Sequence, residues 1–266
     1  MTTILLVGCG KMGGALLDGW LDRGMPGSDI LVVDPVEAKA PTRPGVAVVA
    51  EFGLVPAGWH PDVVVFAVKP QVIDAALPPY GALRGPVFLS IAAGKPLSFF
   101  ARHLGADRPV VRAMPNTPAA VRRGMTVAVA NQHVSAGQKA LCADLLSAVG
   151  ETAWIDDESQ MDAVTALSGS GPAYVFLLAE VMAEAGVAAG LPRDLADRLA
   201  RATVTGSGEL LRQSAERPET LRQNVTSPGG TTYAALQVLM RTDGVATLMR
   251  DAVAAAAARS RELAGA

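Results

Sequence analysis

Hydrophobic residues follow two different patterns along the chain, and the change falls near residue 155. Before it, short continuous apolar runs alternate with segments of helical spacing. Runs of this kind are typical of strands buried on both faces of a parallel sheet. The predicted strands are Thr3–Val7, Ile30–Val33, Asp62–Val68, Pro86–Ile91, Pro109–Ala113, Met125–Ala130 and Thr152–Ile155, and the clearest helices are Ala15–Leu21 and Ser135–Val149. The pattern predicts an α/β fold, a mostly parallel sheet with helices on both faces.

From Ser159 onward the strand pattern disappears and helical spacing continues to the end of the chain. The predicted helices are Asp162–Leu167, Ala173–Leu191, Arg193–Gln213, Tyr233–Arg241 and Val245–Leu263. We therefore predict two domains, an α/β domain over residues 1–156 and an all-helical domain over residues 157–266. These helices carry more apolar surface than a domain of about 110 residues hides by itself. We expect them to pack against a second subunit as an isologous dimer, with a self-contained bundle as the alternative.

A glycine-rich turn, Gly8-Cys9-Gly10-Lys11-Met12-Gly13, lies between the first predicted strand and the first helix. In this context Gly-x-Gly-x-x-Gly binds a dinucleotide. Gly8 permits the tight turn, Gly10 lets the backbone approach the pyrophosphate, and Gly13 lets the helix pack close to the strand. A lone glycine triplet also forms plain tight turns, but its place after the first strand favours a dinucleotide site.

Asp34 ends the second predicted strand, where an acidic residue accepts hydrogen bonds from the adenosine ribose and favours NADH. Pro35 follows at a place where a phosphate-binding arginine is common in NADPH enzymes. Lys39 or Arg43 in the next loop could still reach a 2′-phosphate. The sequence therefore leaves the choice between NADH and NADPH open.

The ends of later strands carry further candidate contacts. Lys69 and Pro70 follow the third strand at the carboxyl edge, where ligands of such sheets bind. Lys69 could meet a cofactor phosphate or ribose, or be an ordinary solvated lysine. Ala92 and Ala93 follow the fourth strand, and small residues there would let a nicotinamide ring lie close to the backbone.

The stretch Asn224–Thr232 (Asn-Val-Thr-Ser-Pro-Gly-Gly-Thr-Thr) has the composition of an anion-binding loop. Pro228 fixes its own φ, and Gly229 and Gly230 allow backbone angles that other residues resist, so several N–H groups can converge. A helix that begins near Thr231 would add its first-turn N–H groups and its positive end. An ordinary helix N-cap after a glycine turn explains the same residues equally well.

Composition narrows the class of protein. The net charge is −2 with a pI near 5.9, which gives no electrostatic reason to expect nucleic acid or an anionic membrane as partner. The two cysteines, Cys9 and Cys142, argue against a disulfide framework or a structural zinc site, and we expect no metal. The first strand pattern begins within three residues of Met1, and Glu180 and Glu184 interrupt the apolar stretch Pro172–Leu191. We expect no signal peptide, a buried helix there instead of a membrane span, and a cytoplasmic protein.

Five segments, in this order, resemble pyrroline-5-carboxylate reductase, the enzyme of the last step of proline biosynthesis. They are Gly8–Gly13, Ala67–Gln71, Arg112–Pro118, Thr165–Tyr174 and Val225–Thr232. The resemblance covers almost the whole chain, and its last two segments are the most specific. It implies a Rossmann-like N-terminal domain and a C-terminal all-α dimerisation domain. It also implies a homodimer, alone or in a larger ring of dimers, with a pocket shared between subunits.

The resemblance also implies residue roles. The dinucleotide, NADPH or NADH, would be held by Gly8, Cys9, Gly10, Lys11, Met12 and Gly13, by Asp34, and by Ala67, Val68, Lys69 and Pro70, with Ala92, Ala93 and Asn224 near its nicotinamide end. The substrate carboxylate would be held by Ser227, Gly229, Gly230, Thr231 and Thr232. Thr232 would be the catalytic residue, placed near the imine nitrogen for hydrogen bonding or proton relay. Many relatives place a basic residue where this chain has Asp34-Pro35, which puts NADPH preference in doubt.

Three alternatives compete with the reductase. A β-hydroxyacid dehydrogenase begins with a similar turn but uses a lysine on the first helix of its second domain, and Ser168–Gly190 contains no lysine. A related imine reductase is the second alternative. A non-catalytic dinucleotide sensor is the third, and it would need neither the 224–232 loop nor Thr232. The sequence does not decide oligomer size beyond a dimer, feedback by proline, or activity on other cyclic imines.

Overall fold

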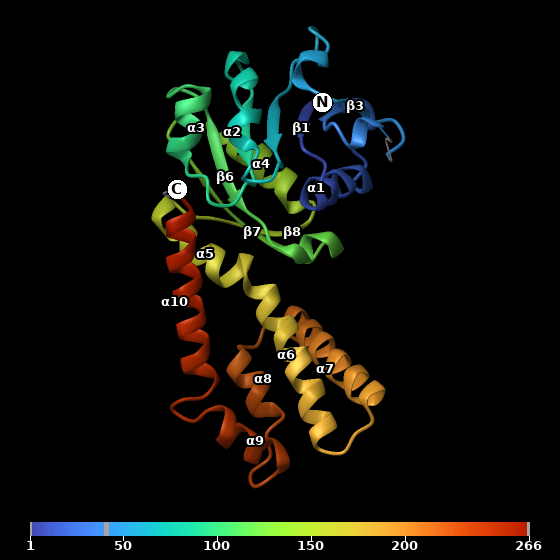
Figure 1. Ribbon diagram of the computed structural model, residues 1–266, viewed down its shortest axis with the longest axis vertical. Coiled ribbons are helices and arrows are strands. Elements are labelled where there is room, and N and C mark those ends of the chain that lie inside the picture. Colours follow the sequence, from blue (N-terminus) through green and yellow to red (C-terminus); the bar gives the residue numbers. More distant parts are fainter. Residues whose placement is uncertain (1, 40–42, 265–266) are drawn as a thin grey trace. The chain divides into compact units, whose positions relative to one another are not determined.

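The computed structural model describes residues 2–39 and 43–264 and divides into two compact units (Figure 1). The first unit runs to Gly169 and includes the C-terminal end of the chain from Ala257, and the second is Ser170–Ala256. The boundary between residues 156 and 157 stays a prediction.

The first unit is built on an eight-stranded sheet in the described part of the chain. Its strands are β1 (Ile4–Val7), β2 (Ile30–Val33), β3 (Ala47–Val49), β4 (Val63–Phe66), β5 (Val87–Ser90), β6 (Val110–Met114), β7 (Gly124–Ala130) and β8 (Gly150–Trp154). Their order is β3-β2-β1-β4-β5-β6-β7-β8. Of these neighbours β6 and β7 run antiparallel, and the other described pairs run parallel. The predicted mostly parallel sheet is confirmed.

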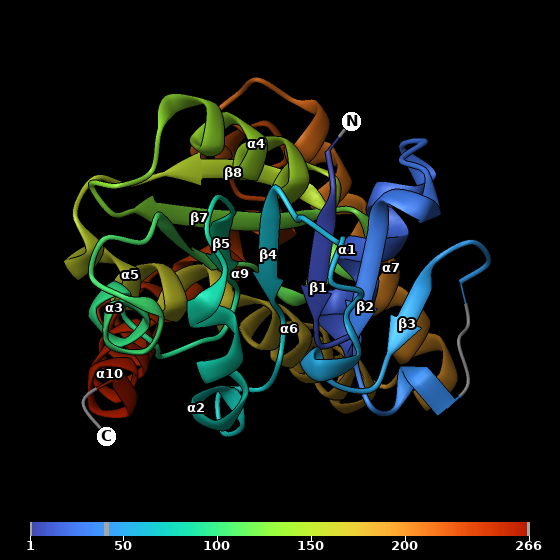
Figure 2. The ribbon, with the colours of Figure 1, turned by 90° about the horizontal axis from the view of Figure 1, so that it is seen from above.

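Apolar side chains on both faces of the sheet explain why these strands are continuous hydrophobic runs. Ile4 and Leu6 of β1 pack on one face with α1 (Lys11–Asp22) and α4 (Ala136–Ser147), whereas Leu5 and Val7 pack on the other with α2 (Ile73–Ala76) and α3 (Leu97–Leu104). Figure 2 shows α4 on one side of the sheet and α2 and α3 on the other. Alternate side chains of a strand point to opposite faces, so both faces need apolar residues.

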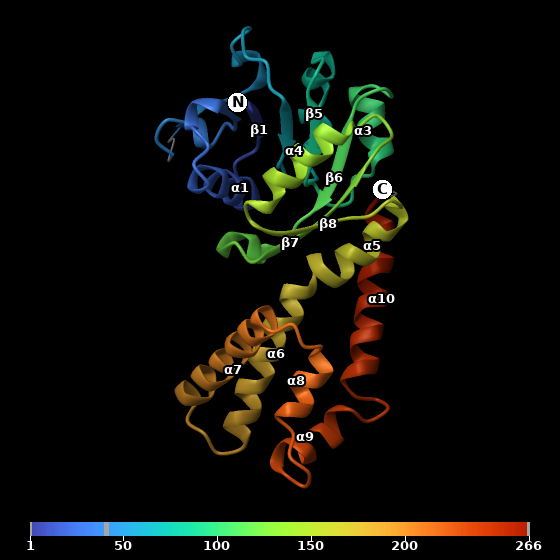
Figure 3. The same ribbon diagram turned by 180° about the vertical axis from the view of Figure 1, so that it is seen from behind.

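Helices make up the rest of the described chain. A short helix α5 (Met161–Val164) and a π-helical turn (Thr165–Gly169) close the first unit. The second unit contains α6 (Gly171–Ala188), α7 (Arg193–Gln213), α8 (Pro218–Asn224), α9 (Thr231–Leu239) and most of α10 (Val245–Ala264). Figures 1 and 3 show α6 and α7 side by side. The predicted all-α C-terminal part is confirmed.

Helix α6 carries apolar side chains that its own chain leaves uncovered. The apolar stretch Pro172–Leu191 was predicted to be buried, in a domain that packs against a second subunit, and in the single chain its large side chains are exposed. The exposed residues are Val175, Phe176, Leu177, Leu178 and Val181, at 45% to 67% of their full area. By length and composition alone, the helical stretch Glu158–Ala188 could also cross a membrane, and 6% of its most apolar window is buried in the chain. An apolar helix this exposed needs a cover outside its own chain.

Candidate active site

Strand register brings the predicted cofactor residues of the first unit to one edge of the sheet. Val7 pairs with Val33 and with Phe66, and Phe66 pairs with Ser90. The strands β2, β1, β4 and β5 therefore end at the same level, and the loops that follow them emerge side by side. The chain passes from β1 outward to β2 and β3 and then returns to β4 beside β1. The point where the strand order reverses is where doubly wound sheets bind their ligands.

Two of the three turn glycines are required by the fold itself. Gly8 has φ +93°, and a Cβ there would lie 2.8 Å from Val68 Cγ1. A Cβ on Gly13 would collide with the Gly8 carbonyl oxygen. These contacts confirm a tight turn at Gly8 and close helix packing at Gly13.

Gly10 differs from both, because the space beside it is open. Its φ of −71° suits any residue, and apart from its neighbours Cys9 and Lys11 no heavy atom of the described residues lies within 4 Å of the position its Cβ would take. Gly10 is also the N-cap of α1, where no described side chain caps the first turn. The helix thus presents uncapped N–H groups and its positive end beneath a clear space, and this arrangement fits a pyrophosphate.

Two exposed lysines and four small or apolar residues complete this edge. Lys11 is the first residue of α1, and Lys69 follows β4. Met12 packs partly against the core, Ala67 and Val68 lie against the glycine turn, and Pro70 is half-buried. The two ammonium groups therefore add positive charge at the edge where phosphates would bind.

Asp34 joins the glycine turn to the loop after β2. Its Oδ2 accepts a hydrogen bond from the Cys9 N–H (2.7 Å), and its Oδ1 accepts from the N–H groups of Val36 (2.8 Å) and Glu37 (3.0 Å). Partial burial alone would raise the pKa of Asp34, but the three N–H donors lower it below its usual value. The carboxylate is therefore charged at neutral pH. The side chain of Lys39 lies outside the described part of the structure.

The Cys9 thiol is unsuited to nucleophilic chemistry. Burial raises its pKa to about 11, and the positive charge of Arg43 opposes this only in part. A thiol in this state is almost fully protonated at neutral pH. Cys9 is a small residue inside the turn, and its backbone N–H holds Asp34.

The loops after β5 and β6 lie at the same edge. Ala92 is buried and its N–H donates to Ser90 Oγ (3.2 Å), while Ala93 is exposed. Asn116, after β6, accepts from the Met125 N–H (2.9 Å) and donates its amide to the carbonyl and hydroxyl oxygens of Ser168 (3.3 Å each). The prolines on either side of Asn116 predict a stiff loop, but nothing local in the sequence predicts these hydrogen bonds.

Glu158 ends the acidic run Asp156–Glu158, a composition typical of a solvated connector, but its side chain is held inside the first unit. One of its oxygens, Oε1, accepts from Arg112 Nη1 (2.7 Å) and from the Leu97 N–H that begins α3 (2.8 Å). Arg112 is buried at 6% exposure. This ion pair joins β6, α3 and the segment that leads into the helical part.

The predicted anion-binding loop belongs to the second unit and contains a type II turn over Ser227–Gly230. The Gly230 N–H donates to the Ser227 carbonyl (3.0 Å), Pro228 occupies the second position, and Gly229 has φ +71° at the third. Gly230 itself has ordinary extended angles, φ −79° and ψ 177°, so the expectation of unusual angles there was wrong. Gly230 is instead the N-cap of α9, and a Cβ there would come within 3.2 Å of the Ser227 carbonyl oxygen.

The turn leads directly into a helix N-terminus that can hold an anion. No side chain in the described residues caps α9, and its first turn carries no acidic residue. Thr231 and Thr232 form that first turn, with Ser227 exposed beside it. The Thr226 hydroxyl, by contrast, donates back to the Arg222 carbonyl (2.6 Å) and is turned into α8. Asn224, expected near the nicotinamide, lies in this unit and donates its amide to Glu216 (3.1 Å).

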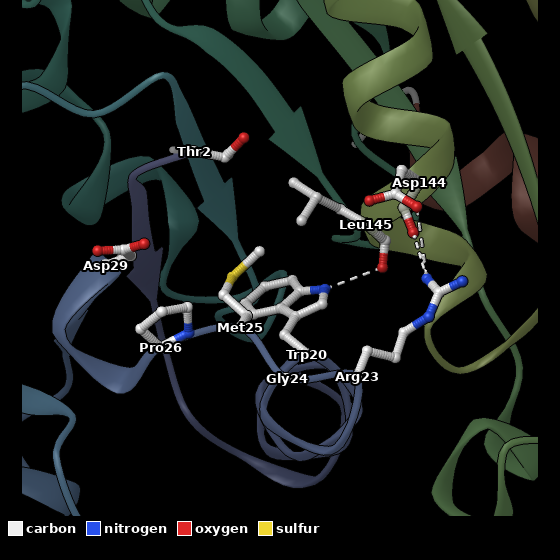
Figure 4. Close-up of a pocket in the computed structure, with 9 residues that line it drawn as sticks. All are labelled: Thr2, Trp20, Arg23, Gly24, Met25, Pro26, Asp29, Asp144 and Leu145. Carbon is white, nitrogen blue, oxygen red and sulfur yellow. Dashed lines mark hydrogen bonds and ion pairs between the residues drawn. The ribbon is translucent and has the colours of Figure 1, made fainter.

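An open pocket of about 420 Å³ lies at the opposite edge of the sheet, near the amino ends of β1 and β2 (Figure 4). Its floor includes Trp20, whose indole N–H donates to the Leu145 carbonyl (2.9 Å). Arg23 at the rim donates to the Asp144 carbonyl (2.9 Å). None of its nine lining residues is a predicted site residue, so we do not assign it to the active site.

Comparison with known proteins gives matches to both parts of the chain. A family model described as pyrroline-5-carboxylate reductase dimerisation matches residues 158–263, and one described as NADP oxidoreductase coenzyme F420-dependent matches residues 3–94. A pyrroline-5-carboxylate reductase from Pseudomonas aeruginosa is 42% identical over 264 residues, covering 98% of this chain and 96% of the relative. This chain belongs to the pyrroline-5-carboxylate reductase family. The resemblance drawn from the sequence motifs is confirmed.

Solved pyrroline-5-carboxylate reductases share the fold along the whole chain. The enzyme from Coxiella burnetii is similar with a TM-score of 0.89 and 33% identity, covering 98% of both chains. A pyrroline carboxylate reductase from Plasmodium falciparum, solved with NADP bound, is similar with a TM-score of 0.82 and 29% identity, covering 99% of this chain and 98% of that one. The Rossmann-like and helical parts expected from the sequence therefore match the family.

Proposed function

We propose that this chain is an NAD(P)H-dependent enzyme that reduces the C=N bond of 1-pyrroline-5-carboxylate to proline, the last step of proline biosynthesis. The observation that carries the proposal is the type II turn at Ser227–Gly230, which ends at the uncapped N-terminus of α9. The same chain holds a second uncapped helix, α1, beneath the open space at Gly10. A reaction between a dinucleotide and a small carboxylate needs both kinds of anion site.

The loop in the second unit would orient the substrate. The N–H groups at the start of α9 would bind the carboxylate, which leaves the ring on the side of the Thr232 hydroxyl. Thr232 would donate a hydrogen bond to the ring nitrogen or relay a proton to it from water, because a threonine hydroxyl is too weak an acid to be the proton source. The bound nicotinamide supplies the hydride.

Helix α6 supports a homodimer as the working form. Its exposed apolar residues lie in the part of the chain that matches the dimerisation model. Glu180 and Glu184 interrupt the same helix, so a second subunit is a better cover for it than lipid. We extend the proposal to a ring of such dimers, to a cytoplasmic enzyme without a membrane or nucleic-acid partner, and to a domain boundary between residues 156 and 157.

Steady-state kinetics of two matched variants test the proposal. Thr232→Ala should lower kcat with pyrroline-5-carboxylate by roughly a hundredfold or more, because losing a group that takes part in proton transfer typically slows a reaction by at least that factor. The dissociation constant of the dinucleotide should change less than about twofold, because Thr232 lies in the other unit. Thr220→Ala, on α8 and outside the loop, should leave both values unchanged.

Two outcomes would count against it. An unchanged kcat in Thr232→Ala would remove Thr232 from the mechanism. Absence of turnover in the unsubstituted protein with both NADH and NADPH, despite tight dinucleotide binding, would favour another imine substrate or a sensor.

A further inference from the structure

Three carboxylates and one guanidinium gather where the adenosine ribose of a dinucleotide would lie. Asp34 and Glu37 follow β2, Asp18 lies on α1, and Arg43 reaches toward α1 from the loop before β3. Counted over these four described side chains alone, one cation faces three anions. A ribose 2′-phosphate brings close to two further negative charges.

Arg43 is held by these carboxylates in the geometry that it would offer to a phosphate. Its Nε and Nη2 donate to the two carboxylate oxygens of Asp18 at 2.9 and 3.1 Å, and its Nη1 donates to Glu37 at 3.1 Å. The paired Nε–Nη2 fork is the arrangement by which arginine binds a phosphate in bidentate fashion. A 2′-phosphate would therefore have to displace Asp18 before it could use that fork.

The surroundings of Arg43 hold its guanidinium in place. The side chains of Arg43 and Glu37 are 21% and 14% exposed, so this pair is less screened than a surface pair, whereas Asp18 is 52% exposed and its pair with Arg43 is screened more strongly. Arg43 Nη2 lies 3.0 Å from the position that a Cβ on Gly14 would take, which places the guanidinium against α1. The hydrogen bond with Asp18 raises the pKa of Arg43 further, so the guanidinium is charged at every working pH.

Asp34 suits a ribose with free hydroxyls. Its Oδ2 accepts one hydrogen bond, from Cys9, so this oxygen keeps capacity to accept from a ribose hydroxyl. The same charged oxygen would repel a phosphate ester at that position. The Asp34 carboxylate would therefore both accept a hydrogen bond from the ribose of NADH and repel the 2′-phosphate of NADPH.

We propose that this cluster makes the chain select NADH over NADPH, with Asp34 and Glu37 rejecting the 2′-phosphate and Asp18 keeping Arg43 from binding it. The inference rests on the proposed function, in which a dinucleotide is the hydride donor. The inference is drawn from side chains of this chain, and the Plasmodium falciparum relative that was solved with NADP bound is a different protein.

Isothermal titration calorimetry with NAD⁺, NADP⁺, 5′-ADP and 2′,5′-ADP tests the inference without turnover. The unsubstituted protein should bind NAD⁺ at least about tenfold more tightly than NADP⁺, and 5′-ADP more tightly than 2′,5′-ADP. Asp18→Asn and Glu37→Gln keep the side-chain shapes and remove one charge each. Each should tighten NADP⁺ and 2′,5′-ADP several-fold while the NAD⁺ constant changes less than about twofold.

Two further variants complete the design. Asp34→Asn should bring the dissociation constants of NAD⁺ and NADP⁺ closer together, because it weakens NAD⁺ binding and removes a charge that repels NADP⁺. If this variant does not fold, Glu37→Gln still tests the inference. Asp29→Asn removes the same charge at the other end of β2, beside the opposite edge of the sheet, and should change neither constant.

The inference is overturned if the unsubstituted protein binds NADP⁺ as tightly as NAD⁺ or more tightly, or if it binds neither. It is also overturned if Asp18→Asn and Glu37→Gln shift all four ligands equally. Failure of the proposed reductase activity would show separately, as absence of turnover in a protein whose binding constants follow the predicted order.

Discussion

Replacing Gly10 by alanine tests whether the glycine is needed for the stability of the fold or for binding the dinucleotide. Apart from its two chain neighbours, a Cβ at this position meets no heavy atom of the described residues within 4 Å, and φ of −71° is an ordinary value for alanine. Losing glycine at an N-cap costs up to about 1 kcal/mol. Alanine also restricts the unfolded chain more than glycine does, and this stabilises the folded state by about 0.4–1 kcal/mol. The net change in the free energy of unfolding should stay within about 1 kcal/mol, a Tm shift of no more than about 4 °C.

Dinucleotide binding should respond quite differently. If the pyrophosphate lies against the Gly10 backbone, the new methyl group occupies its place. We expect the NAD⁺ dissociation constant of Gly10→Ala to rise at least about tenfold, or about 1.4 kcal/mol. Gly13→Ala is the contrasting variant, because its Cβ would meet the Gly8 carbonyl oxygen and force α1 away from the turn. It should lose about 1–3 kcal/mol of stability.

Thermal unfolding and calorimetric titration on both variants give the two values. A Gly10→Ala protein that binds NAD⁺ as tightly as the unsubstituted chain would show that the space above Gly10 is not the pyrophosphate site. A Gly10→Ala protein destabilised as much as Gly13→Ala would show that the open space is absent in solution.

Three other perturbations probe separate parts of the account. Phe176→Glu, at 67% exposure on α6, should convert a dimer to a monomer in multi-angle light scattering, and an unchanged mass would move the interface elsewhere. Glu158→Ala leaves Arg112 buried without its partner and should cost about 3 kcal/mol in urea unfolding, whereas the exposed Asp156→Ala should cost far less. Since the pKa of Cys9 is raised to about 11, alkylation by iodoacetamide should be slow at pH 8 and rise about tenfold per pH unit up to that value; rapid labelling at pH 7 would contradict the environment described.

Local signals were sufficient for most of the sheet and for the cofactor turn. Continuous apolar runs located the longer strands to within about two residues, and the spacing of Gly8, Gly10 and Gly13 needed no tertiary information. Strand β3 was missed because it is a three-residue edge strand with little buried surface. Helix α3 was also missed, since it has only eight residues and follows a proline.

Features that depend on distant partners could not be predicted. Glu158 reads as the end of an acidic run until the fold places Arg112 beside it, 46 positions earlier in the chain. The apolar composition of α6 predicts burial but does not say by which chain, and in the single chain its large side chains are exposed. The hydrogen bond from Arg43 to Asp18 likewise joins residues 25 positions apart and is visible only in the structure.

Isotope transfer tests the central claim most directly. The purified protein is given pyrroline-5-carboxylate and NADH that carries deuterium at both C4 positions, and the product is examined by mass spectrometry and NMR. We expect proline with one deuterium at C5 for each NADH oxidised. Oxidation of NADH without labelled proline, or no oxidation of either NADH or NADPH, would contradict it.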